Sequence, residues 1–376
     1  MPAFQAWPRP CGWLALDSRQ GSCYYFGMKT KSYHKQQDAQ NITRLREILK
    51  ELPEFLAGYY ATLSGQASTG TRLAYAYDLR IFFGYLSEEV FDGVKPKDIS
   101  VLDMALVESS HIHAFMEYLT YYIPASEPDS FLHNQAKGKS RKLAAVRKLF
   151  KYLYTNKLVL ANPAELVSFP KINQKAITTL EVDEIAKLLD EVDSGEKLSP
   201  RQQKFHEHTK LRDAAIITTL LGTGMRVSEM VGLDLTDIDF GVNGLKVTRK
   251  GGDEMVLYFG KEVEAALKTY LEHRGMLTPI EGHENALFLS LQNRRITSRA
   301  VQNLVKKYAH LVTRLKQISP HKLRSTFGTQ LYGETGDIYL VANVLGHTDV
   351  NTTRKHYAKM DESYRKRAAN VVKLRD

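Results

Sequence analysis

The pattern of apolar and polar positions in the first half of the chain predicts helices. Between residues 41 and 56, apolar side chains fall three or four positions apart, which is the spacing of one face of an amphipathic helix. Pro53 lies inside this stretch and predicts a break or a kink, because proline has no backbone N–H. Three further stretches have the same period: 71–86, 108–122 and 140–154. Together the four predict a small all-helical domain.

The pattern changes after residue 160. Residues 161–175 have no clear period and contain Pro163 and Pro170, which is typical of a linker. Three elements are predicted next: a helix at 179–189, a charged insert at 192–210, and a strongly apolar helix at 211–221 that ends at Gly222 and Gly224.

A short β-sheet is predicted in the second half. The stretches 245–248 and 255–259 have the composition of strands and flank the turn Gly251-Gly252, and 287–289 predicts a third short strand. Helices are expected again from Ser298 onward. The whole chain is therefore expected to be mainly α with a small β-sheet.

The expected organisation is a leader and two domains. The leader, 1–27, holds both tryptophans, both cysteines and three prolines without a helical period, and it lacks the apolar core of a signal peptide. It is expected to be disordered or to reflect a translation start assigned too early. A helical domain at 28–170 and a mixed domain at 171–376 follow, and 376 residues suit two domains better than one core.

Charge and cysteine content narrow the class of protein. The formal net charge of +10 fits a polyanionic partner, although basic soluble proteins without such a partner are common. Cys11 and Cys23 are the only cysteines, so no disulfide framework is available and a reducing cytoplasm is the expected location. No apolar run approaches the roughly 18 residues of a membrane span.

The most specific signal is an ordered set of polar residues in the second half. It combines two guanidinium groups, two imidazoles and a phenol: Arg226, Arg324, His321, His347 and Tyr357. Such a set suits breaking a phosphodiester without a metal ion, because the planar fork of arginine donates to two phosphate oxygens and stays protonated. Each motif alone is common on solvated surfaces, and only the ordered set indicates function.

These residue types divide the work of the reaction. Attack on phosphorus places extra negative charge on the non-bridging oxygens, and Arg226 and Arg324 are the candidates to stabilise it. Ser319-Pro320 predicts a helix start, so His321 and Arg324 lie on one helix face. Histidine titrates near neutral pH, so His321 is the candidate to accept the phenol proton.

The set resembles the signature of the tyrosine recombinases, the family of phage integrases and Xer proteins, which is Arg, Lys, His-x-x-Arg, His or Trp, and Tyr. The resemblance implies that Tyr357 is the nucleophile and that Lys250, in the predicted hairpin turn, protonates the departing 5′ oxygen. Arg249 and Lys246 remain alternatives to Lys250, and Tyr364 is a second phenol.

His347 follows Gly346, a predicted helix C-cap, and is expected to hydrogen-bond the phosphate. No cofactor is expected, because a covalent phosphotyrosine conserves the bond energy needed for rejoining. No metal site is expected either, since His206 and His208 lie in the polar insert without a third ligand and are interpreted as solvated.

Basic residues on the predicted helix at 140–154 and its lead-in indicate a DNA-contacting surface, although a solvated basic face is the alternative. The candidates there are Lys139, Arg141, Lys142 and Arg147. Arg72 and Tyr75, on the helix at 71–86, resemble the partner surface of that helix in the family.

The resemblance runs from about residue 41 to the C-terminus and is of the Xer type. It implies a two-domain clamp on double-stranded DNA, with a helical core-binding domain and a mixed α+β catalytic domain. It also implies a homotetramer on two DNA sites, with 361–376 as a tail helix that docks on a neighbouring protomer. Activation by a DNA translocase of the FtsK type stays open.

The implied role is resolution of chromosome dimers at a dif-like site, and an integrase of a mobile element is the alternative. Many such integrases carry an additional strand-rich N-terminal domain, whereas residues 28–60 here predict helix. Two other classes share parts of the pattern. A catalytically silent DNA-binding protein would keep the fold, and a type IB topoisomerase would share the chemistry without needing a tetramer tail.

Overall fold

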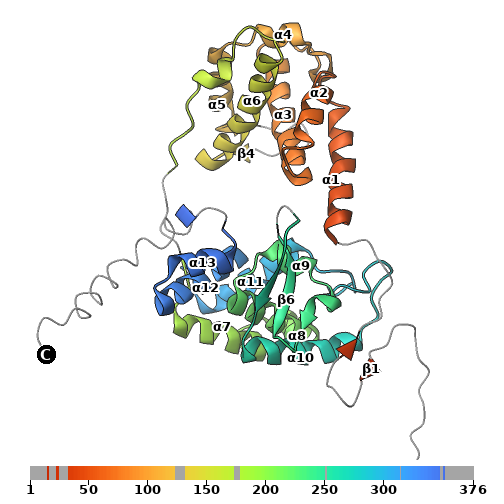
Figure 1. Cartoon of the computed structure of the whole chain (residues 1–376). Helices are drawn as coiled ribbons and strands as arrows, with labels where there is room; N and C mark the ends of the chain where they lie inside the picture. The colour runs from red at the N-terminus through yellow and green to blue at the C-terminus, as the bar shows by residue number, and fades with distance from the viewer. Residues whose placement is uncertain are drawn as a thin grey trace, which may run out of the picture. The chain divides into compact units, whose positions relative to one another are not determined.

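The computed structural model describes the following residues: 15–16, 23–24, 33–122, 132–172, 178–249, 252–313, 315–347 and 350–351 (Figure 1). The chain divides into two compact units between Lys175 and Ala176. We call residues 31–175 the helical unit and those from 176 onward the mixed unit. Of the predicted leader, only β1 (Ala15–Leu16) and its antiparallel partner β2 (Cys23–Tyr24) are described, and the rest lies outside the described residues.

Helices build almost all of the helical unit, and the four predicted ones are confirmed with shifted ends. Its elements in chain order are α1 (Tyr33–Leu49), α2 (Leu56–Leu63), α3 (Thr69–Glu89), η1 (Pro96–Asp98), α4 (Val101–Ala105), α5 (Ser109–Tyr118), β3 (Tyr121–Tyr122), β4 (Leu132–His133), α6 (Ala136–Thr155) and η2 (Pro163–Leu166). As predicted, the chain leaves the helical conformation near Pro53, and α1 ends at Leu49.

Side-chain caps decide where two of these helices begin. The hydroxyl of Ser68 accepts a hydrogen bond from the backbone N–H of Thr71 at 3.3 Å and starts α3 two residues before the predicted start. Ser100 and Asp103 form a reciprocal capping box at the start of α4. The sequence prediction missed α4, because five residues are too few to show a helical period.

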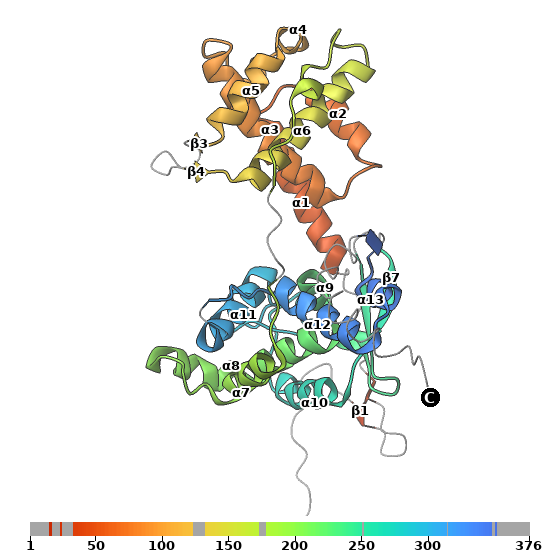
Figure 2. The same ribbon diagram turned by 90° about the vertical axis from the view of Figure 1, so that its left-hand side faces the viewer.

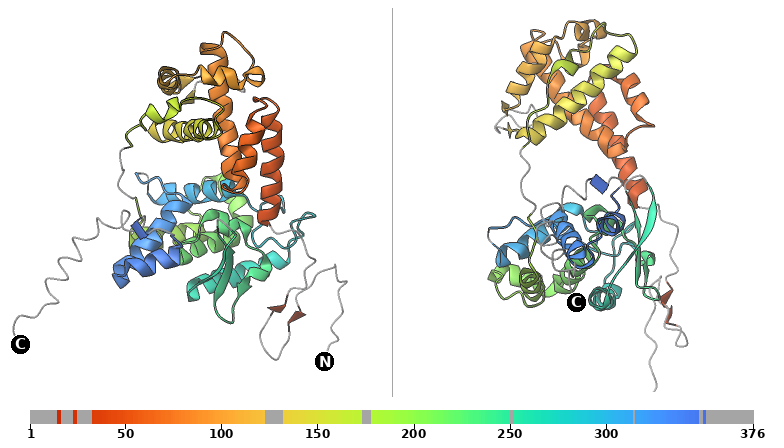
Figure 3. Two further views of the ribbon diagram at one scale, coloured as in Figure 1. Left: turned by 45° about the horizontal axis from the view of Figure 1, so that its top comes forward. Right: turned by 60° about the vertical axis from the view of Figure 1, so that its left-hand side comes forward.

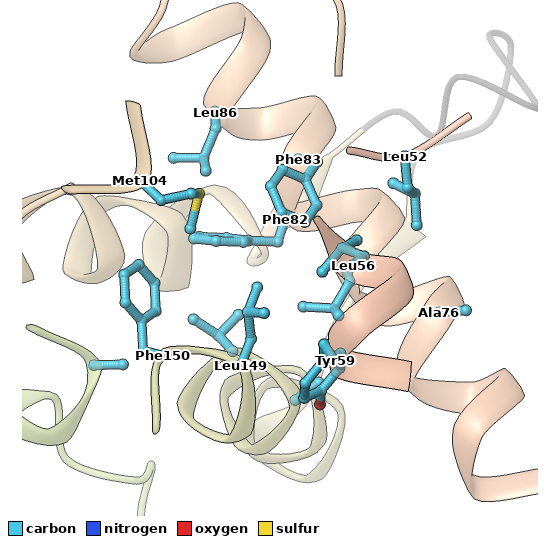
Figure 4. Close-up of a cluster of buried hydrophobic side chains, with 14 of the residues drawn as sticks. Leu52, Leu56, Tyr59, Ala76, Phe82, Phe83, Leu86, Met104, Leu149 and Phe150 are labelled. Carbon is cyan, nitrogen blue, oxygen red and sulfur yellow. The ribbon is translucent and has the colours of Figure 1, made fainter. Parts of the chain in front are cut away.

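Aromatic rings fill the centre of the helical unit (Figure 4). Phe82 of α3 is fully buried and makes edge-to-face contacts with Phe115 of α5 at 5.0 Å and Phe150 of α6 at 6.4 Å between ring centroids. Phe83 lies at its other side, 5.9 Å away. Because this ring of α3 contacts both α5 and α6, the packing of the unit depends on it.

The mixed unit combines a three-stranded antiparallel sheet with helices. Its elements are α7 (Val182–Ser194), α8 (Pro200–Thr223), α9 (Val227–Gly232), η3 (Leu235–Asp237), β5 (Ile238–Asp239), β6 (Gly244–Thr248), β7 (Glu254–Tyr258), α10 (Lys261–Gly275), α11 (Ser298–Val312), α12 (Pro320–Thr335) and α13 (Ile338–Leu345). The strand order is β5-β6-β7, with Thr248 opposite Glu254 at the end of the β6–β7 hairpin. Figure 2 shows α7 and α8 side by side, with α11 against both.

The predicted strand at 287–289 is wrong. Within this stretch only one isolated bridge occurs, between Leu289 and Arg295, and the third strand of the sheet is β5. The apolar run Leu287-Phe288-Leu289 is buried because it packs in the core, and a buried apolar run of three residues does not distinguish a strand from an extended core segment.

The predicted charged insert at 192–210 is also wrong. Ser199 and Gln202 cap α8, which starts at Pro200 and continues through the apolar stretch to Thr223. His206 is 2% exposed rather than solvated, and its Nδ1 lies 3.0 Å from the Tyr308 hydroxyl, which donates to Asp213 at 3.1 Å. The first half of α8 is therefore mostly exposed but is anchored through buried polar side chains, His206 and Thr209, which a search for apolar periodicity does not detect.

A buried carboxylate joins α3 to α6 in the helical unit. Asp78 is 1% exposed, and its Oδ2 accepts a hydrogen bond from Arg141 Nη1 at 2.7 Å. Burial raises the pKa of Asp78 from 3.8 to about 6, and the nearby charges of Arg141 and Lys142 only partly offset this effect.

No described helix of either unit is both long and apolar enough to cross a membrane.

We expect Phe82→Ala to lower the free energy of unfolding by about 3–5 kcal/mol, because it removes a buried ring and leaves a cavity between three helices. Urea unfolding of the full chain, followed by circular dichroism, measures this loss. Glu89→Ala, an exposed change on the same helix, serves as the control and should lie near the wild type. Equal effects of the two changes would contradict the central position of Phe82.

Asp78 contributes to the free energy of unfolding, and we expect this contribution to decrease as the pH rises from about 4 to about 6. In this window the folded protein holds a proton that the unfolded chain, with its pKa near 3.8, has released. Asp78→Asn does not titrate, so the unfolding free energy of the wild type minus that of the variant should fall by about 2–3 kcal/mol across the window and then stay level. Glu88→Gln should show no such change, and a pH-independent difference for Asp78→Asn would refute the raised pKa.

Candidate active site

Arg226 lies where α8 gives way to α9. Gly224 ends α8 in the left-handed conformation, with φ of 62°, and a Cβ there would overlap the ring of Phe327. Two residues later Arg226 is the N-cap of α9, and the buried carboxylate of Glu229 holds it at two points. Glu229 accepts hydrogen bonds from the Arg226 backbone N–H at 2.8 Å and from its Nη1 at 2.7 Å. One carboxylate therefore fixes both the backbone and the guanidinium group of Arg226.

His321 and Arg324 lie on α12, which begins at Pro320 as the sequence predicts. His321 is exposed in the first turn, and Arg324 follows three residues later on the same helix face. Arg324 is 4% exposed and donates from Nη1 to the carbonyl of Gly224 at 2.6 Å and from Nη2 to the carbonyl of Leu345. This side chain therefore links the end of α8 to the end of α13.

His347 follows the C-terminal turn of α13. Asp337 caps the start of this helix, and Gly346 ends it with φ of 60°. The backbone N–H of His347 donates to the carbonyl of Ala342 at 2.9 Å, which closes the turn. His347 is consequently held by its backbone at the helix terminus, and its side chain is half-buried. In both views of Figure 3, α12 and α13 lie together.

Three arginines from three different elements donate to three consecutive carbonyls at this helix end. Arg249 Nη2 donates to Val344 at 3.1 Å, Arg324 Nη2 donates to Leu345, and Arg226 Nη2 donates to Gly346 at 3.2 Å. We call Arg226, Arg249 and Arg324 the arginine cluster. The last carbonyls of a helix lack partners within the helix and carry the negative end of its dipole, so cationic donors satisfy them well. The structure thus brings Arg226, Arg324 and His347 together at one turn.

The β6–β7 hairpin contributes Arg249, while Lys250 lies outside the described residues. Arg249 donates its backbone N–H to the carbonyl of Asp253 at 2.7 Å and accepts from Gly252 N–H at 3.0 Å. Lys246, one alternative to Lys250, forms an ion pair with Glu254 at 2.8 Å. Tyr357, its alternative Tyr364 and the predicted tail helix at 361–376 also lie outside the described residues.

The arrangement can receive a phosphate at a cationic surface. The Arg226 side chain remains 35% exposed, so it is accessible from solvent although Glu229 orients it. Arg324 is buried and its position is fixed by backbone carbonyls. In the ranges that the structure describes, no three acidic, histidine or cysteine side chains are grouped so that they could hold a metal ion.

The six residues predicted to contact DNA lie on α3 and α6 of the helical unit. Arg72 and Tyr75 are half-buried near the start of α3, and Tyr75 packs against the core. On α6, Arg141 is 51% exposed and bonded to Asp78, whereas Lys139 Nζ donates to the Thr120 hydroxyl at 2.6 Å. These contacts leave the DNA-binding prediction untested.

Lys142 and Arg147 also use their polar atoms within the unit. Lys142 is 5% exposed, donates to Asn134 at 2.9 Å, and has a pKa lowered by burial. Arg147 donates to the carbonyls of Ala164 at 3.1 Å and Glu165 at 2.8 Å, and so holds η2 against α6. Both therefore have structural roles that their sequence positions did not reveal.

Sequence reasoning gave no role to Glu229 or Arg249. Glu229 stands three residues after Arg226, which is the spacing of a side-chain pair on a helix, so the sequence held a signal for it. Arg249 appeared only as a competitor of Lys250. Its contact with α13 depends on the fold, since 95 residues separate Arg249 from Val344.

Comparison with known proteins gives consistent results. The model of the phage integrase family matches residues 178–363. The tyrosine recombinase XerC of Caldanaerobacter subterraneus subsp. tengcongensis is 34% identical over 332 residues, which are 85% of this chain and 85% of that protein. XerC of Leptospira interrogans is 30% identical over 82% of this chain and 90% of the relative.

Solved structures share the fold. The XerH site-specific recombinase, bound to a palindromic difH substrate after cleavage, has a TM-score of 0.61 and 20% identity, over 89% of each chain. The Tn1549 transposon integrase in complex with transposon right end DNA has a TM-score of 0.59 and 19% identity, over 84% of this chain and 98% of that one. The predicted fold class and the predicted family are confirmed: this chain belongs to the phage integrase family of tyrosine recombinases, enzymes that cleave and rejoin DNA.

Proposed function

We propose that this chain is a site-specific recombinase of the Xer type that cuts DNA through a covalent 3′-phosphotyrosine and then rejoins it. The observation that carries this proposal is the meeting of Arg226 and Arg324 at the carbonyls of Leu345 and Gly346, directly before His347. Two fixed guanidinium groups beside an imidazole suit a phosphate that gains negative charge during the reaction. Identity above 30% to XerC proteins over most of the chain supports the Xer type.

The proposed reaction exchanges one phosphodiester for another. The Tyr357 oxygen attacks phosphorus while the bond from phosphorus to the 5′ oxygen breaks, and the phenol proton passes to His321. Lys250 gives a proton to the departing 5′ oxygen, which leaves as a hydroxyl. Attack by a 5′ hydroxyl on the phosphotyrosine reverses these steps and rejoins the strand, so no ATP is consumed.

The surrounding groups stabilise the transition state. Arg226 and Arg324 donate to the non-bridging oxygens, and His347 adds a further hydrogen bond. The side chains of the protein supply the positive charge that this step needs. The proposal therefore includes neither a metal ion nor another cofactor.

We propose that the two units divide DNA binding and catalysis. Residues 28–170 act as the core-binding domain, and residues 171–376 act as the catalytic domain with the tail helix at its end. Double-stranded DNA is the partner, in keeping with the DNA-bound XerH and Tn1549 integrase structures that share the fold. Within the helical unit, Arg72 and Arg141 are the strongest candidates for phosphate contacts. Arg141 stays 51% exposed although it pairs with Asp78, whereas Lys142 is buried and Arg147 donates to two backbone carbonyls.

The proposed cellular role is resolution of chromosome dimers at a dif-like site by a cytoplasmic tetramer, with a translocase of the FtsK type as a candidate activator. The XerC relatives support this role. We also propose that the chain is of the kind of the single-protein recombinase XerS. Integration of a mobile element is the second candidate, because the Tn1549 transposon integrase shares the fold.

We expect the purified protein to form a covalent complex with a nicked, labelled duplex that carries a candidate chromosomal site, in the presence of a chelator. Denaturing electrophoresis detects the complex. Tyr357→Phe should bind the same duplex on a native gel and form no covalent complex, because it lacks the attacking oxygen, whereas Tyr364→Phe should behave as the wild type.

A covalent complex that survives in Tyr357→Phe would refute the nucleophile assignment. Duplexes that carry the ends of a mobile element, tested in parallel, distinguish integration from dimer resolution. Relaxation of a supercoiled plasmid without any site would instead indicate a topoisomerase.

We expect Arg324→Lys to slow cleavage about 100- to 1,000-fold, because one ammonium group cannot replace the two donors of the guanidinium fork. Single-turnover cleavage at saturating protein measures this rate. Urea unfolding checks that the variant is folded, and Arg294→Lys, at an exposed position, is the control. Cleavage by folded Arg324→Lys at the wild-type rate would remove Arg324 from the catalytic set.

A further inference from the structure

The third member of the arginine cluster has no role in the reaction proposed above. Arg249 reaches from the β6–β7 hairpin turn to the end of α13, where its Nη2 donates to Val344 at 3.1 Å. Its guanidinium group lies against Gly346 so closely that a Cβ on that residue would overlap it. The contact therefore depends on glycine at position 346 for space as well as for backbone conformation.

This placement opposes the usual preference of arginine for solvent. Burial lowers the pKa of Arg249, and the neighbouring positive charge of Arg226 lowers it further, while Glu229 acts in the opposite direction. Its Nε is also buried without a hydrogen-bond partner among the described residues. A flexible side chain at a surface hairpin could avoid these costs by extending into water, so its folded position requires a compensating interaction.

The compensation comes from the helix end and from Glu229. A helix C-terminus attracts cations, and the carbonyl of Val344 gives Arg249 a directed acceptor. The backbone of Arg249 is fixed independently through Asp253 and Gly252 in the hairpin turn. The backbone of Arg249 is thus held in the hairpin turn, and its guanidinium group is held at the C-terminal turn of α13.

Those two segments carry proposed catalytic groups. Lys250 is the next residue after Arg249, and His347 is the next residue after Gly346. A displacement of the hairpin relative to α13 would therefore move Lys250 away from the phosphate that the arginines and His347 bind. Proton transfer requires heavy atoms within about 3 Å, so a small displacement is sufficient to impair it.

We propose that Arg249 is a positioning residue, whose contact with the C-terminal turn of α13 holds the β6–β7 turn so that Lys250 reaches the departing 5′ oxygen. The inference rests on the proposed function, since it assumes that Lys250 is the proton donor. It assigns to Arg249 no contact with DNA. Loss of Arg249 should therefore impair the leaving-group step and leave phosphate binding intact.

A change of leaving group separates these two effects. A duplex with sulfur in place of the bridging 5′ oxygen at the scissile phosphate releases a thiol, whose pKa lies near 8.5, so that it departs as a thiolate without a proton donor. Variants that have lost proton donation should therefore recover on this substrate. Variants that have lost stabilisation of the non-bridging oxygens should not recover.

The experiment compares full-length variants in single-turnover formation of the covalent complex on the oxygen and sulfur duplexes. We expect Arg249→Ala to be slowed about 10- to 100-fold on the oxygen duplex, which is less than the full contribution of a general acid, and to approach the wild-type rate on the sulfur duplex. Lys250→Ala should show a larger defect and the same recovery. Arg324→Lys should remain slow on both duplexes.

Two further variants control for changes in folding and in charge. Lys261→Ala removes an exposed cation at the start of α10, shortly after the hairpin, and should cleave both duplexes at the wild-type rate. Gly346→Ala disturbs the Arg249 contact together with the turn that holds Arg226 and His347, so it should be slow on both duplexes and gives the pattern of a general loss of the site. Urea midpoints show whether each variant is folded.

The outcomes distinguish the inference from the function on which it rests. Wild-type cleavage of the oxygen duplex by Arg249→Ala, or an equal defect on both duplexes, would overturn the positioning role while Lys250→Ala still recovers on sulfur. If Lys250→Ala itself fails to recover on sulfur, the proton-donor assignment in the proposed function is wrong, and the positioning role is overturned with it.

Discussion

The candidate site depends on the C-terminal turn of α13. Its three last carbonyls have no partners within the helix, and arginines from α9, α12 and the β6–β7 hairpin complete their hydrogen bonding. Three positively charged guanidinium groups at one helix end repel one another, and these acceptors offset the repulsion. Because the helix end fixes them, groups that the sequence separates by about a hundred residues acquire one defined geometry. The position of His347, immediately after this turn, follows from the same constraint.

A second polar network supports this arrangement from within the mixed unit. Asp213 of α8 is buried and receives hydrogen bonds from Arg212, Tyr308 and Lys307, the last at 3.4 Å. It therefore joins α8 to α11, and His206 extends the network along α8. Since α8 ends at the glycine whose carbonyl binds Arg324, its anchoring fixes one of the two attachment points of that arginine. A buried carboxylate with several donors is stable only while all of them remain in place.

Sequence patterns predicted the helices and strands that bury an apolar face. The prediction failed where polar side chains hold an element in place or where an element is too short to show a period. The helices around Phe82 and the β6–β7 hairpin show clear periods, and α12 begins at the predicted proline. The first half of α8 is held by His206 and other polar side chains, so its amino-acid composition resembled a solvated loop. The motifs identified Arg226 and Arg324 as a pair, but the contact of Arg249 with α13 depends on tertiary structure alone.

The acceptors around the arginine cluster are mostly uncharged, and this affects how the site meets its substrate. Backbone carbonyls orient a guanidinium group without neutralising it, whereas a carboxylate partner would cancel its charge. Glu229 is hydrogen-bonded to Arg226, whereas Arg249 donates to the carbonyl of Val344 and Arg324 donates to the carbonyls of Gly224 and Leu345. An incoming phosphodiester therefore meets guanidinium groups that backbone carbonyls have already oriented. The fold holds a preformed electrostatic potential whose strength, unlike that of a surface ion pair, depends little on side-chain rearrangement.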